Sequence, residues 1–399
     1  MALIPFATAR QRLLDSAHQV AETECLGIGE AFGRALAVDL PAPITVPPFA
    51  NAAMDGYALL AADLRSPGMR LRVSQRVAAG DVASPLEPGS AARIFTGAQM
   101  PDGADTVVMQ EYCVADGDTV IVNQIPPAGE HVRAAGSAMR AGETMVAAGE
   151  RLTAGALGLI ASVGIAEVAV RRRLRVAIFF TGSELVDPGR PLAPGRIYNA
   201  NRYVMLGFLR DLGCEVIDLG IIPDDREATR DALRRAAAAA DLIVTSGGMS
   251  EGDEDHVVAS VRAEGRLDVW KIAAKPGKPL AFGSVGGAAF IGLPGNPMSV
   301  WVGMLVLVAP FLRRCQGYAR IEAESLPMRA DFNYAVKGDR MEFVRVRRNA
   351  RGGLDVHPRQ DSSVIASAVW ADGLVAIEAG ASVVPGDTVS FLPGPAWTP

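Results

Sequence analysis

The chain has 399 residues, of which 49% are hydrophobic, so it can bury large cores and is long enough for about two to four domains. Its formal net charge of -5 argues against nucleic acid as the main partner. The 4 cysteines and 4 histidines are scattered without a CxxC pair, which disfavours a zinc site and favours reduced cytosolic thiols.

The sequence shows no sign of an export or membrane segment. The N-terminal stretch MALIPFATARQRLL lacks a basic region followed by a long apolar core. The longest apolar run, residues 300–312, is too short to span a bilayer and contains Pro310. We therefore expect a soluble, cytoplasmic protein in which this run is a buried helix.

The first part of the chain is predicted to be mostly β structure. Residues 8–20 have the pattern of a short amphipathic helix. Residues 41–124 are rich in turn signals, and 106–124 predicts two strands around the Asp116-Gly117 turn. A second short helix, closed by a glycine, is predicted at 153–164.

From residue 174 onward, strands and helices alternate, which predicts a parallel sheet covered by helices. After about residue 325 the helical period disappears, and the remaining short strands predict a small antiparallel β domain. The alternating region contains predicted strands at 174–180, 215–222, 241–246, 267–273 and 288–293, and predicted helices at 201–213, 226–240, 253–265 and 297–314.

Unusual residues follow the predicted strands of this sheet. In an open α/β sheet, ligands bind beyond the carboxyl ends of the strands. The residues at or beside those ends are small, acidic or basic. In chain order they are Glu184, then Asp224 and Asp225, then Ser246, Gly247, Gly248, Ser250, Asp253 and Asp255, then Lys271, Lys275 and Lys278, and finally Asn296 and Ser299.

Each residue type has a physical use at such an edge. Glycine and serine loops that lead into helices bring backbone N–H groups to phosphate oxygens at the positive end of the helix dipole. Lysines add positive charge to an anion site, whereas carboxylates beside an anion need a cation between them, which suggests Mg²⁺. The edge therefore predicts a phosphorylated ligand with a divalent metal, and its lysines are predicted to hold phosphate.

Ordinary structural explanations exist for each motif. Residues 181–185 suit a strand-to-helix turn, 246–255 suit a linker with an acidic helix start, and 223–226 suit a helix N-cap. The lysines would also suit a solvated surface. The fixed turn at 293–297 is the hardest to explain in this way, and the convergence of all the motifs at one sheet edge favours function.

Three motifs, taken together, resemble one protein family. MDGYA at 54–58, KPGKP at 275–279 and LPGNP at 293–297, in this order and spacing, resemble the molybdopterin molybdenumtransferases, the molybdenum-insertion enzymes related to the gephyrin E domain. TGSEL and SGGMSEGDED, which lie between the first two, fit the same pattern. The resemblance covers nearly the whole chain.

This resemblance implies an architecture. It implies an elongated domain made of residues 1–44 and 136–172, an inserted β-rich domain at 45–135, a molybdopterin-binding α/β domain at 173–322 and a C-terminal β barrel at 323–399. It also implies a homodimer whose active cleft lies between the α/β domain of one subunit and the inserted domain of the other.

The resemblance also implies a reaction. Molybdenum from molybdate enters adenylylated molybdopterin, AMP is released, and Mg²⁺ assists. Implied transient partners are the molybdopterin adenylyltransferase and downstream molybdoenzymes or carriers, with no nucleic acid and no membrane. Two alternatives stay open, namely a molybdopterin adenylyltransferase and a non-catalytic molybdopterin-binding carrier or scaffold. The predicted inserted and barrel domains disfavour the first, and the carboxylates and lysines disfavour the second.

By motif, the resemblance assigns catalytic roles to Asp55, Glu184, Asp224 and Asp255, with Glu184 and Asp255 as metal ligands. The implied substrate-binding residues are Thr96, Ser246, Gly247, Gly248, Ser250, Lys271, Lys275, Lys278, Pro294, Gly295, Asn296, Pro297, Arg345 and Ser362.

Three alanines depart from the family pattern. Ala50 and Ala52 stand where the family usually has an aspartate and a serine, and Ala138 stands where it has an aspartate. A methyl group cannot ligate a cation or relay a proton. Glu143 and Glu251 are the candidate substitutes for the missing carboxylate at 138, but neither has its backbone position, and misplaced catalytic groups are costly. We therefore expect pterin binding with slow molybdenum insertion.

Overall fold

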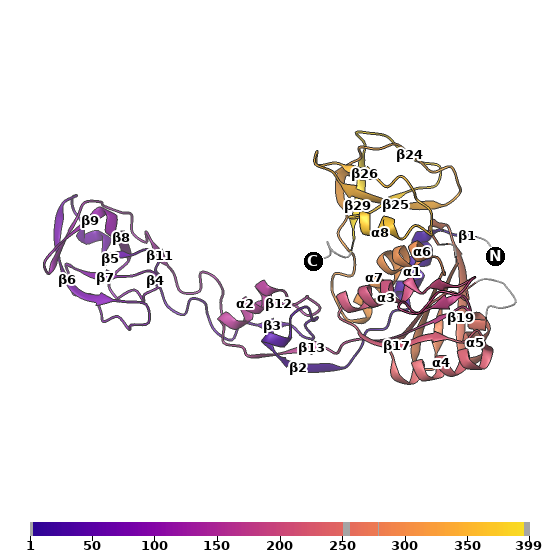
Figure 1. The fold of residues 1–399 in the computed structure, drawn as a ribbon. Coiled ribbons are helices and arrows are strands. Elements are labelled where there is room, and N and C mark those ends of the chain that lie inside the picture. The colour runs from indigo at the N-terminus through magenta and orange to yellow at the C-terminus, as the bar shows by residue number, and fades with distance from the viewer. Residues whose placement is uncertain (1–2, 250–255, 278, 395–399) are drawn as a thin grey trace.

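The computed structural model describes residues 3–249, 256–277 and 279–394. They form an elongated molecule, shown in Figure 1. A β-rich part lies at one end, a small linking part lies in the middle, and an α/β part and a second β part are stacked at the other end, near both termini. The chain crosses the middle part twice, once outward and once returning. The predicted multidomain α/β-plus-β fold class is confirmed.

The β-rich part at the far end contains a six-stranded sheet in the order β8-β5-β7-β6-β10-β9. Small and branched residues of this sheet build two separate apolar cores. The hairpin predicted around Asp116-Gly117 is confirmed, because β9 and β10 pair antiparallel there. The elements are β5 (Gly56–Leu59), β6 (Met69–Val77), β7 (Ser90–Ile94), β8 (Thr106–Met109), β9 (Cys113–Asp116) and β10 (Thr119–Val122), with 3₁₀ turns η2 (Ala61–Asp63) and η3 (Gln110–Tyr112), and β4 (Asn51–Ala52) paired with β11 (Val132–Arg133) where the chain enters and leaves.

The middle part is made of two antiparallel strand pairs and one helix. The predicted helix is present as α2 (Ala154–Ser162), which is capped by the Thr153 hydroxyl and ends before Gly164, whose φ of 79° is left-handed. Its core is a small apolar cluster that includes Leu36 and Ile160. The other elements are β2 (Thr23–Gly27) paired with β13 (Glu167–Arg171), β3 (Leu40–Pro41) paired with β12 (Thr144–Val146), and the 3₁₀ turn η1 (Ile28–Glu30).

The α/β part contains a seven-stranded sheet in the order β1-β19-β21-β22-β18-β14-β17. The predicted all-parallel sheet is wrong in one respect, because β21 (Pro279–Val285) is antiparallel to both of its neighbours and makes the sheet mixed. The prolines of 275–279 favour a loop, yet Pro279 is the first residue of this strand, a position where proline is tolerated. The other strands are β1 (Leu3–Ile4), β14 (Arg175–Thr181), β17 (Glu215–Ile222), β18 (Leu242–Ser246), β19 (Gly265–Ile272) and β22 (Ala288–Leu293).

The N-terminal segment packs with this α/β part. Strand β1 pairs in parallel with β19, and helix α1 (Phe6–Asp15) buries Leu13 and Leu14 in the largest core. This happens because the apolar face of α1 packs against the long apolar helix near the end of the α/β part. The helix predicted at 8–20 therefore begins and ends earlier than expected.

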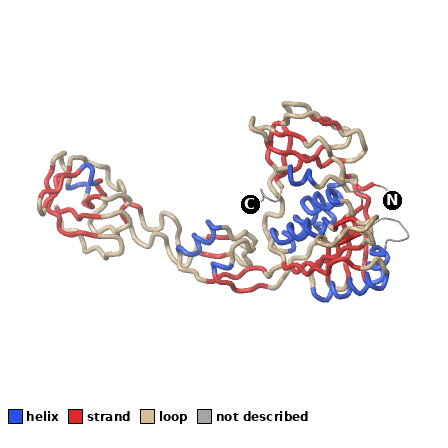
Figure 2. The backbone as a smooth tube through the Cα atoms, viewed as in Figure 1, coloured by secondary structure: helices blue, strands red, loops and turns tan. Residues whose placement is uncertain are grey.

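Helices cover both faces of the sheet, as Figure 2 shows. Helices α4 (Arg226–Ala239) and α5 (His256–Glu264) build one core with the sheet. Helix α3 (Ala200–Asp211) and the long apolar helix at 297–315 build the other core, together with α1. The apolar helix comprises α6 (Pro297–Gly303), a π-helical turn η4 (Met304–Val308) and α7 (Ala309–Cys315). It is long and apolar enough to cross a membrane, but 89% of it is buried inside the protein, so it is a core helix as predicted.

The C-terminal part is a β barrel. Its strands run in the order β20-β25-β27-β29-β23, and β26 pairs with β25. A bridge between Ala330, which follows β23, and Leu354 of β26 closes the barrel around a core that includes Phe391. One strand, β20 (Ala274–Lys275), comes from the α/β part and pairs in parallel with β25. The remaining elements are β23 (Leu326–Arg329), β24 (Tyr334–Ala335), β25 (Met341–Arg348), β26 (Leu354–Val356), α8 (Ala366–Trp370), β27 (Gly373–Ile377), β28 (Ser382–Val383) and β29 (Thr388–Pro393).

Candidate functional site

The candidate site is the edge at which the strands of the α/β sheet end. Strands β14, β17, β18 and β22 are parallel, and β19 has the same direction because the intervening β21 is antiparallel to both β19 and β22. Their carboxyl ends therefore meet at one edge. We call the loops that follow these ends the rim, and their described residues are 181–184, 223–225, 247–249, 273–277 and 294–299.

The centre of the rim has an open backbone made by glycines. Gly247 and Gly248 have φ angles of 90° and 66°, a conformation that other residues rarely adopt. A Cβ atom at Gly248 would lie 2.6 Å from Cγ2 of Val257, so the position has no room for a side chain. The Gly247 N–H donates to the Leu293 carbonyl over 3.1 Å, which joins the end of β18 to the end of β22.

Asn201 connects the same two strand ends, and the sequence analysis did not single it out. Its Nδ2 donates to Oγ of Ser246 over 3.0 Å and to the carbonyl of Gly295 over 2.7 Å. Its Oδ1 is buried and has no hydrogen-bond partner in the part of the chain that the structure describes. A buried acceptor without a partner is costly and is a natural contact for a ligand. The signal was present, because Asn201 lies in RIYNANRYVM (196–205), a further stretch of the chain that resembles the family.

The two proline-rich loops pack against each other. A Cβ atom at Gly277, whose φ is 97°, would lie 3.4 Å from Cβ of Ser299 and 3.5 Å from Cγ of Pro294. The structure thus brings the loop of Lys275 to the start of α6, where Gly295 and Asn296 are exposed and Pro297 opens the helix. Helix N-termini carry partial positive charge, which suits an anion.

The predicted lysines do not all share this position. The ammonium of Lys275 lies 3.2 Å from Oε1 of Glu342, a carboxylate from the barrel. Lys271 lies within β19, opposite Pro279, and Lys278 lies outside the described residues. Among the described lysines, Lys275 is therefore the one placed on the loop that packs against α6.

Two predicted residues come from the barrel, and they play different parts. The carbonyl of Ser362 accepts a hydrogen bond from the Met298 N–H over 3.0 Å, which places the Ser362 loop at the start of α6. Arg345 is 1% exposed, and burial lowers its pKa. Its guanidinium donates to the carbonyls of Arg359 and Asp361, so it supports the loop that carries Ser362 from beneath.

The predicted carboxylates occupy neighbouring strand ends. Glu184 follows β14 and Asp224 follows β17, and both are exposed. Asp225 is an N-cap, because its Oδ2 accepts the Ala228 N–H over 2.9 Å. Ser250, Asp253 and Asp255 lie outside the described residues. Within the described ranges, no three His, Cys, Asp or Glu side chains form a group that could hold a metal ion.

Asp55 and Thr96 form a fixed pair on the inserted domain. Oδ1 of Asp55 accepts from both the backbone N–H and the hydroxyl of Thr96, each over 2.8 Å. These bonds lower the pKa of Asp55. Figure 1 places their strands, β5 and the end of β7, at the opposite end of the molecule from the rim. A single chain therefore does not bring this pair together with the rim.

The three alanines that depart from the family pattern lie near the segments through which the chain enters and leaves the inserted domain. Ala52 is fully buried in β4, and the Ala50 carbonyl accepts from the Met100 N–H. Ala138 is exposed, and its N–H donates to the Val46 carbonyl over 3.1 Å. Of the candidate substitutes, Glu143 accepts the Arg140 N–H of its own turn over 3.1 Å, and Glu251 lies outside the described residues.

Three family models match the chain in succession. They are the MoeA N-terminal region (domain I and II) at residues 4–164, a probable molybdopterin binding domain at 177–314 and the MoeA C-terminal region (domain IV) at 327–393. The α/β part and its rim coincide with the second match. The fold and the site thus define a multidomain protein built around a molybdopterin-binding α/β domain.

Similar proteins narrow the class further. The chain is 40% identical to a molybdopterin molybdenumtransferase of Haemophilus influenzae, over 77% of each chain. It is 37% identical to one from Nostoc sp., over 75% of this chain and 71% of the relative. A molybdopterin biosynthesis MoeA structure from Pyrococcus horikoshii is 31% identical with a TM-score of 0.81, covering 98% of this chain and 99% of that one. The chain belongs to the MoeA family of molybdopterin molybdenumtransferases.

Proposed function

We propose that this molybdenumtransferase takes adenylylated molybdopterin and molybdate as substrates, inserts the metal at the pterin dithiolene and releases AMP. The observation that carries the proposal is the packing of Gly277 against Pro294 and Ser299, which puts the Lys275 loop beside the start of α6. A phosphate at the start of α6 would meet the positive end of the helix dipole, and the loop beside it carries the ammonium of Lys275. The unpartnered Oδ1 of Asn201 offers a further polar contact to the same ligand.

Mg²⁺ is part of the proposal. Glu184, one of the two predicted metal ligands, offers a hard carboxylate oxygen, the kind of ligand that Mg²⁺ takes, and the carboxylate of Asp224 follows the neighbouring strand. Asp255, the other predicted ligand, lies outside the described residues. Bound there, the ion would supply positive charge between the carboxylates and the anionic substrates. The chain's own carboxylates would hold it, and the exposed side chains leave access for molybdate.

We propose that the complete site forms between two copies of the chain in the cytoplasm. Asp55 and Thr96 lie far from the rim of their own chain, so a second copy must supply them if they act on the substrate. Transient contacts with the molybdopterin adenylyltransferase that delivers the substrate, and with carriers or molybdoenzymes that take the product, follow from the same proposal. Nucleic acid and membrane have no part in it.

The first test removes the charge of Lys275. We expect Lys275→Gln to weaken the binding of adenylylated molybdopterin by roughly 10- to 100-fold, because it removes a charge-assisted phosphate contact worth about 1.5–3 kcal/mol. Isothermal titration of both folded proteins measures the effect. Equal affinities for the wild type and the variant would contradict the proposed role of this rim.

The second test restores a carboxylate at Ala138. Because the methyl group of Ala138 cannot ligate a cation or relay a proton, we expect Ala138→Asp to raise the rate of AMP release severalfold without tightening pterin binding. The position is exposed, so the larger side chain fits. Single-turnover AMP release is the measurement, with Ser137→Asp as the control for added charge. An unchanged rate in a folded dimer would point to a substitute carboxylate, and Glu251→Gln would then be examined.

A further inference from the structure

The contact between Lys275 and Glu342 joins two domains at the rim. Their strands pair in parallel, with Ala274 opposite Met341 and Lys275 opposite Glu342. The Met341 N–H donates to the Ala273 carbonyl over 3.0 Å, which extends the backbone pairing. The loop of Lys275 is therefore an edge strand of the barrel, and the two side chains face each other as a cross-strand pair.

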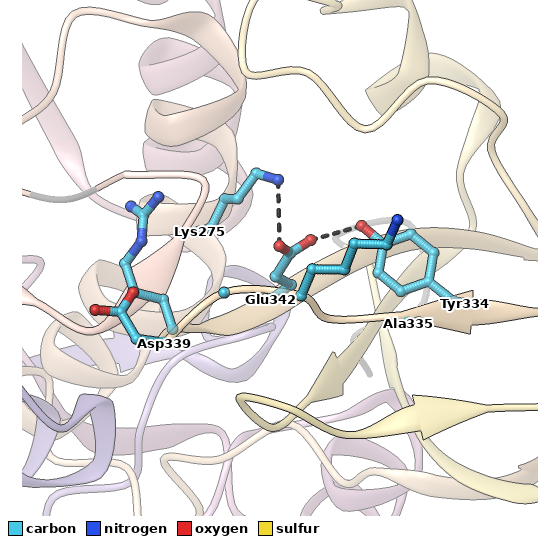
Figure 3. A pocket seen from close by; sticks show the side chains of 8 residues that line it. Lys275, Tyr334, Ala335, Asp339 and Glu342 are labelled. Carbon is cyan, nitrogen blue, oxygen red and sulfur yellow. Dashed lines mark hydrogen bonds and ion pairs between the residues drawn. The ribbon is translucent and has the colours of Figure 1, made fainter.

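Glu342 is the more buried partner of this ion pair. Its side chain is 13% exposed, whereas that of Lys275 is 44% exposed. The hydroxyl of Tyr334 donates to Oε2 of Glu342 over 2.5 Å, so the carboxylate is bound from two sides, as Figure 3 shows. The pKa of Tyr334 is raised, first by burial and then by this hydrogen bond, which keeps the phenol a donor. The carboxylate is thus fixed, while the Lys275 side chain keeps access to solvent.

A pocket of about 330 Å³ opens beside this pair. It is large enough for a tetrahedral oxyanion, and its lining mixes both signs of charge. The other charged side chains are Lys337, Asp339 and Arg340, all of which come from the barrel segment that precedes β25. An anion that reaches Lys275 at this place meets the negative charge of Glu342 at the same ammonium group.

We infer that Glu342 is a resident counter-ion that competes with the substrate oxyanion for Lys275 and so sets the anion affinity of the rim. The inference rests on the proposed function, in which Lys275 binds an oxyanion of the substrates. With the rim free, Glu342 neutralises the ammonium. When the phosphate or molybdate arrives, the exposed lysine head turns to it while its backbone stays paired to β25. Glu342 is a positioning residue in this scheme, because it acts through Lys275.

Such a counter-ion has a use in turnover. An enzyme gains little from holding the substrate and product tightly, because uniform binding does not speed the chemical step. A fixed carboxylate that pairs with Lys275 weakens the hold on both, because each anion must displace it from the ammonium group. It also returns Lys275 to a defined place once the product has left.

The test exchanges Glu342 for its neutral isostere. We expect Glu342→Gln to tighten anion binding by about 3- to 10-fold, the range for one partly exposed charge pair. Isothermal titrations with AMP and with molybdate, performed separately at fixed ionic strength, show which of the two oxyanions uses Lys275. Asp339→Asn is the matched control, since it removes an exposed carboxylate from the same pocket, and it should change the affinities less than twofold.

The double variant Lys275→Gln/Glu342→Gln separates this inference from the proposed function. Its affinity should equal that of Lys275→Gln alone, because the competition acts through the lysine. Unchanged or weaker binding of both anions by Glu342→Gln overturns the inference, as does a gain that persists without Lys275. If Lys275→Gln with Glu342 intact binds both anions as well as the wild type, the proposed role of Lys275 fails first, and the inference falls with it.

Discussion

At subsaturating substrate, an equal mixture of Asp55→Ala and Lys275→Gln chains is expected to recover about a quarter of the wild-type turnover, although each variant alone is slower by about 10-fold or more. The reason is the distance between the two ends of the chain. Asp55, fixed by Thr96, lies on the inserted domain, and Lys275 lies on the rim at the far end. If one site takes both residues, they must come from two chains.

The expected fraction follows from pairing statistics. Random association makes about half of the dimers mixed, and each mixed dimer has one site with both residues intact and one with neither. The measurement is AMP release after the two proteins have been unfolded and refolded together, with separately refolded proteins as the control. If the rate of AMP release does not exceed the mean of the two single variants, Asp55 and Lys275 of different chains do not act in one shared site.

The sequence was sufficient to predict the position of those site residues that directly follow buried strands. The small residues at Ser246, Gly247 and Gly248 and the turn at 293–297 follow β18 and β22, whose apolar runs are unambiguous. Adjacent parallel strands place their ends side by side, so a local pattern was enough to predict a shared edge. The multidomain fold class was recognised from motif order, which carries more information than composition.

What the sequence could not predict depends on partners that are distant in the chain. Glu342 meets Lys275 across 67 positions, and nothing local to either residue signals the pair. Strand β21 was missed because two prolines precede its buried part, and tertiary pairing with β19 and β22 outweighs the local turn chemistry. The packing partner of helix α1 could not be predicted, because an amphipathic pattern shows that a face is buried but does not show against what.

Arg345 is a residue for which the family motif and the structure suggest different roles. The motif places it near the cleft as a substrate-binding residue, whereas its guanidinium is buried and donates to Oγ of Ser367 and to the carbonyls of Arg359 and Asp361. These carbonyls belong to the loop that leads to Ser362. The structure therefore favours an indirect role, in which Arg345 fixes the loop that meets the start of α6.

We expect Arg345→Met to lower the free energy of unfolding of the barrel by about 2–4 kcal/mol, because it leaves buried carbonyls without donors. Hydrogen exchange should rise in residues 357–364, and anion binding at the rim should weaken as a secondary effect. Arg347→Met is the matched control on the same strand. Arg347 is exposed and stacks on Trp370 at 4.5 Å, so its loss should cost about 0.5–1 kcal/mol.

The two roles of Arg345 give opposite patterns. A direct substrate contact predicts a large loss of anion affinity with unchanged stability and unchanged exchange in 357–364. If Arg345 supports the loop, the stability of the barrel and the hydrogen exchange of 357–364 should change first. Saturating ligand should then order the loop again and restore binding. Arg345→Lys sharpens the comparison, because one ammonium keeps the charge but cannot reach two carbonyls and the Ser367 hydroxyl with the fixed fork of a guanidinium. We expect Arg345→Lys to restore little of the lost stability, since the geometry of the donors, more than the charge, holds the loop in place.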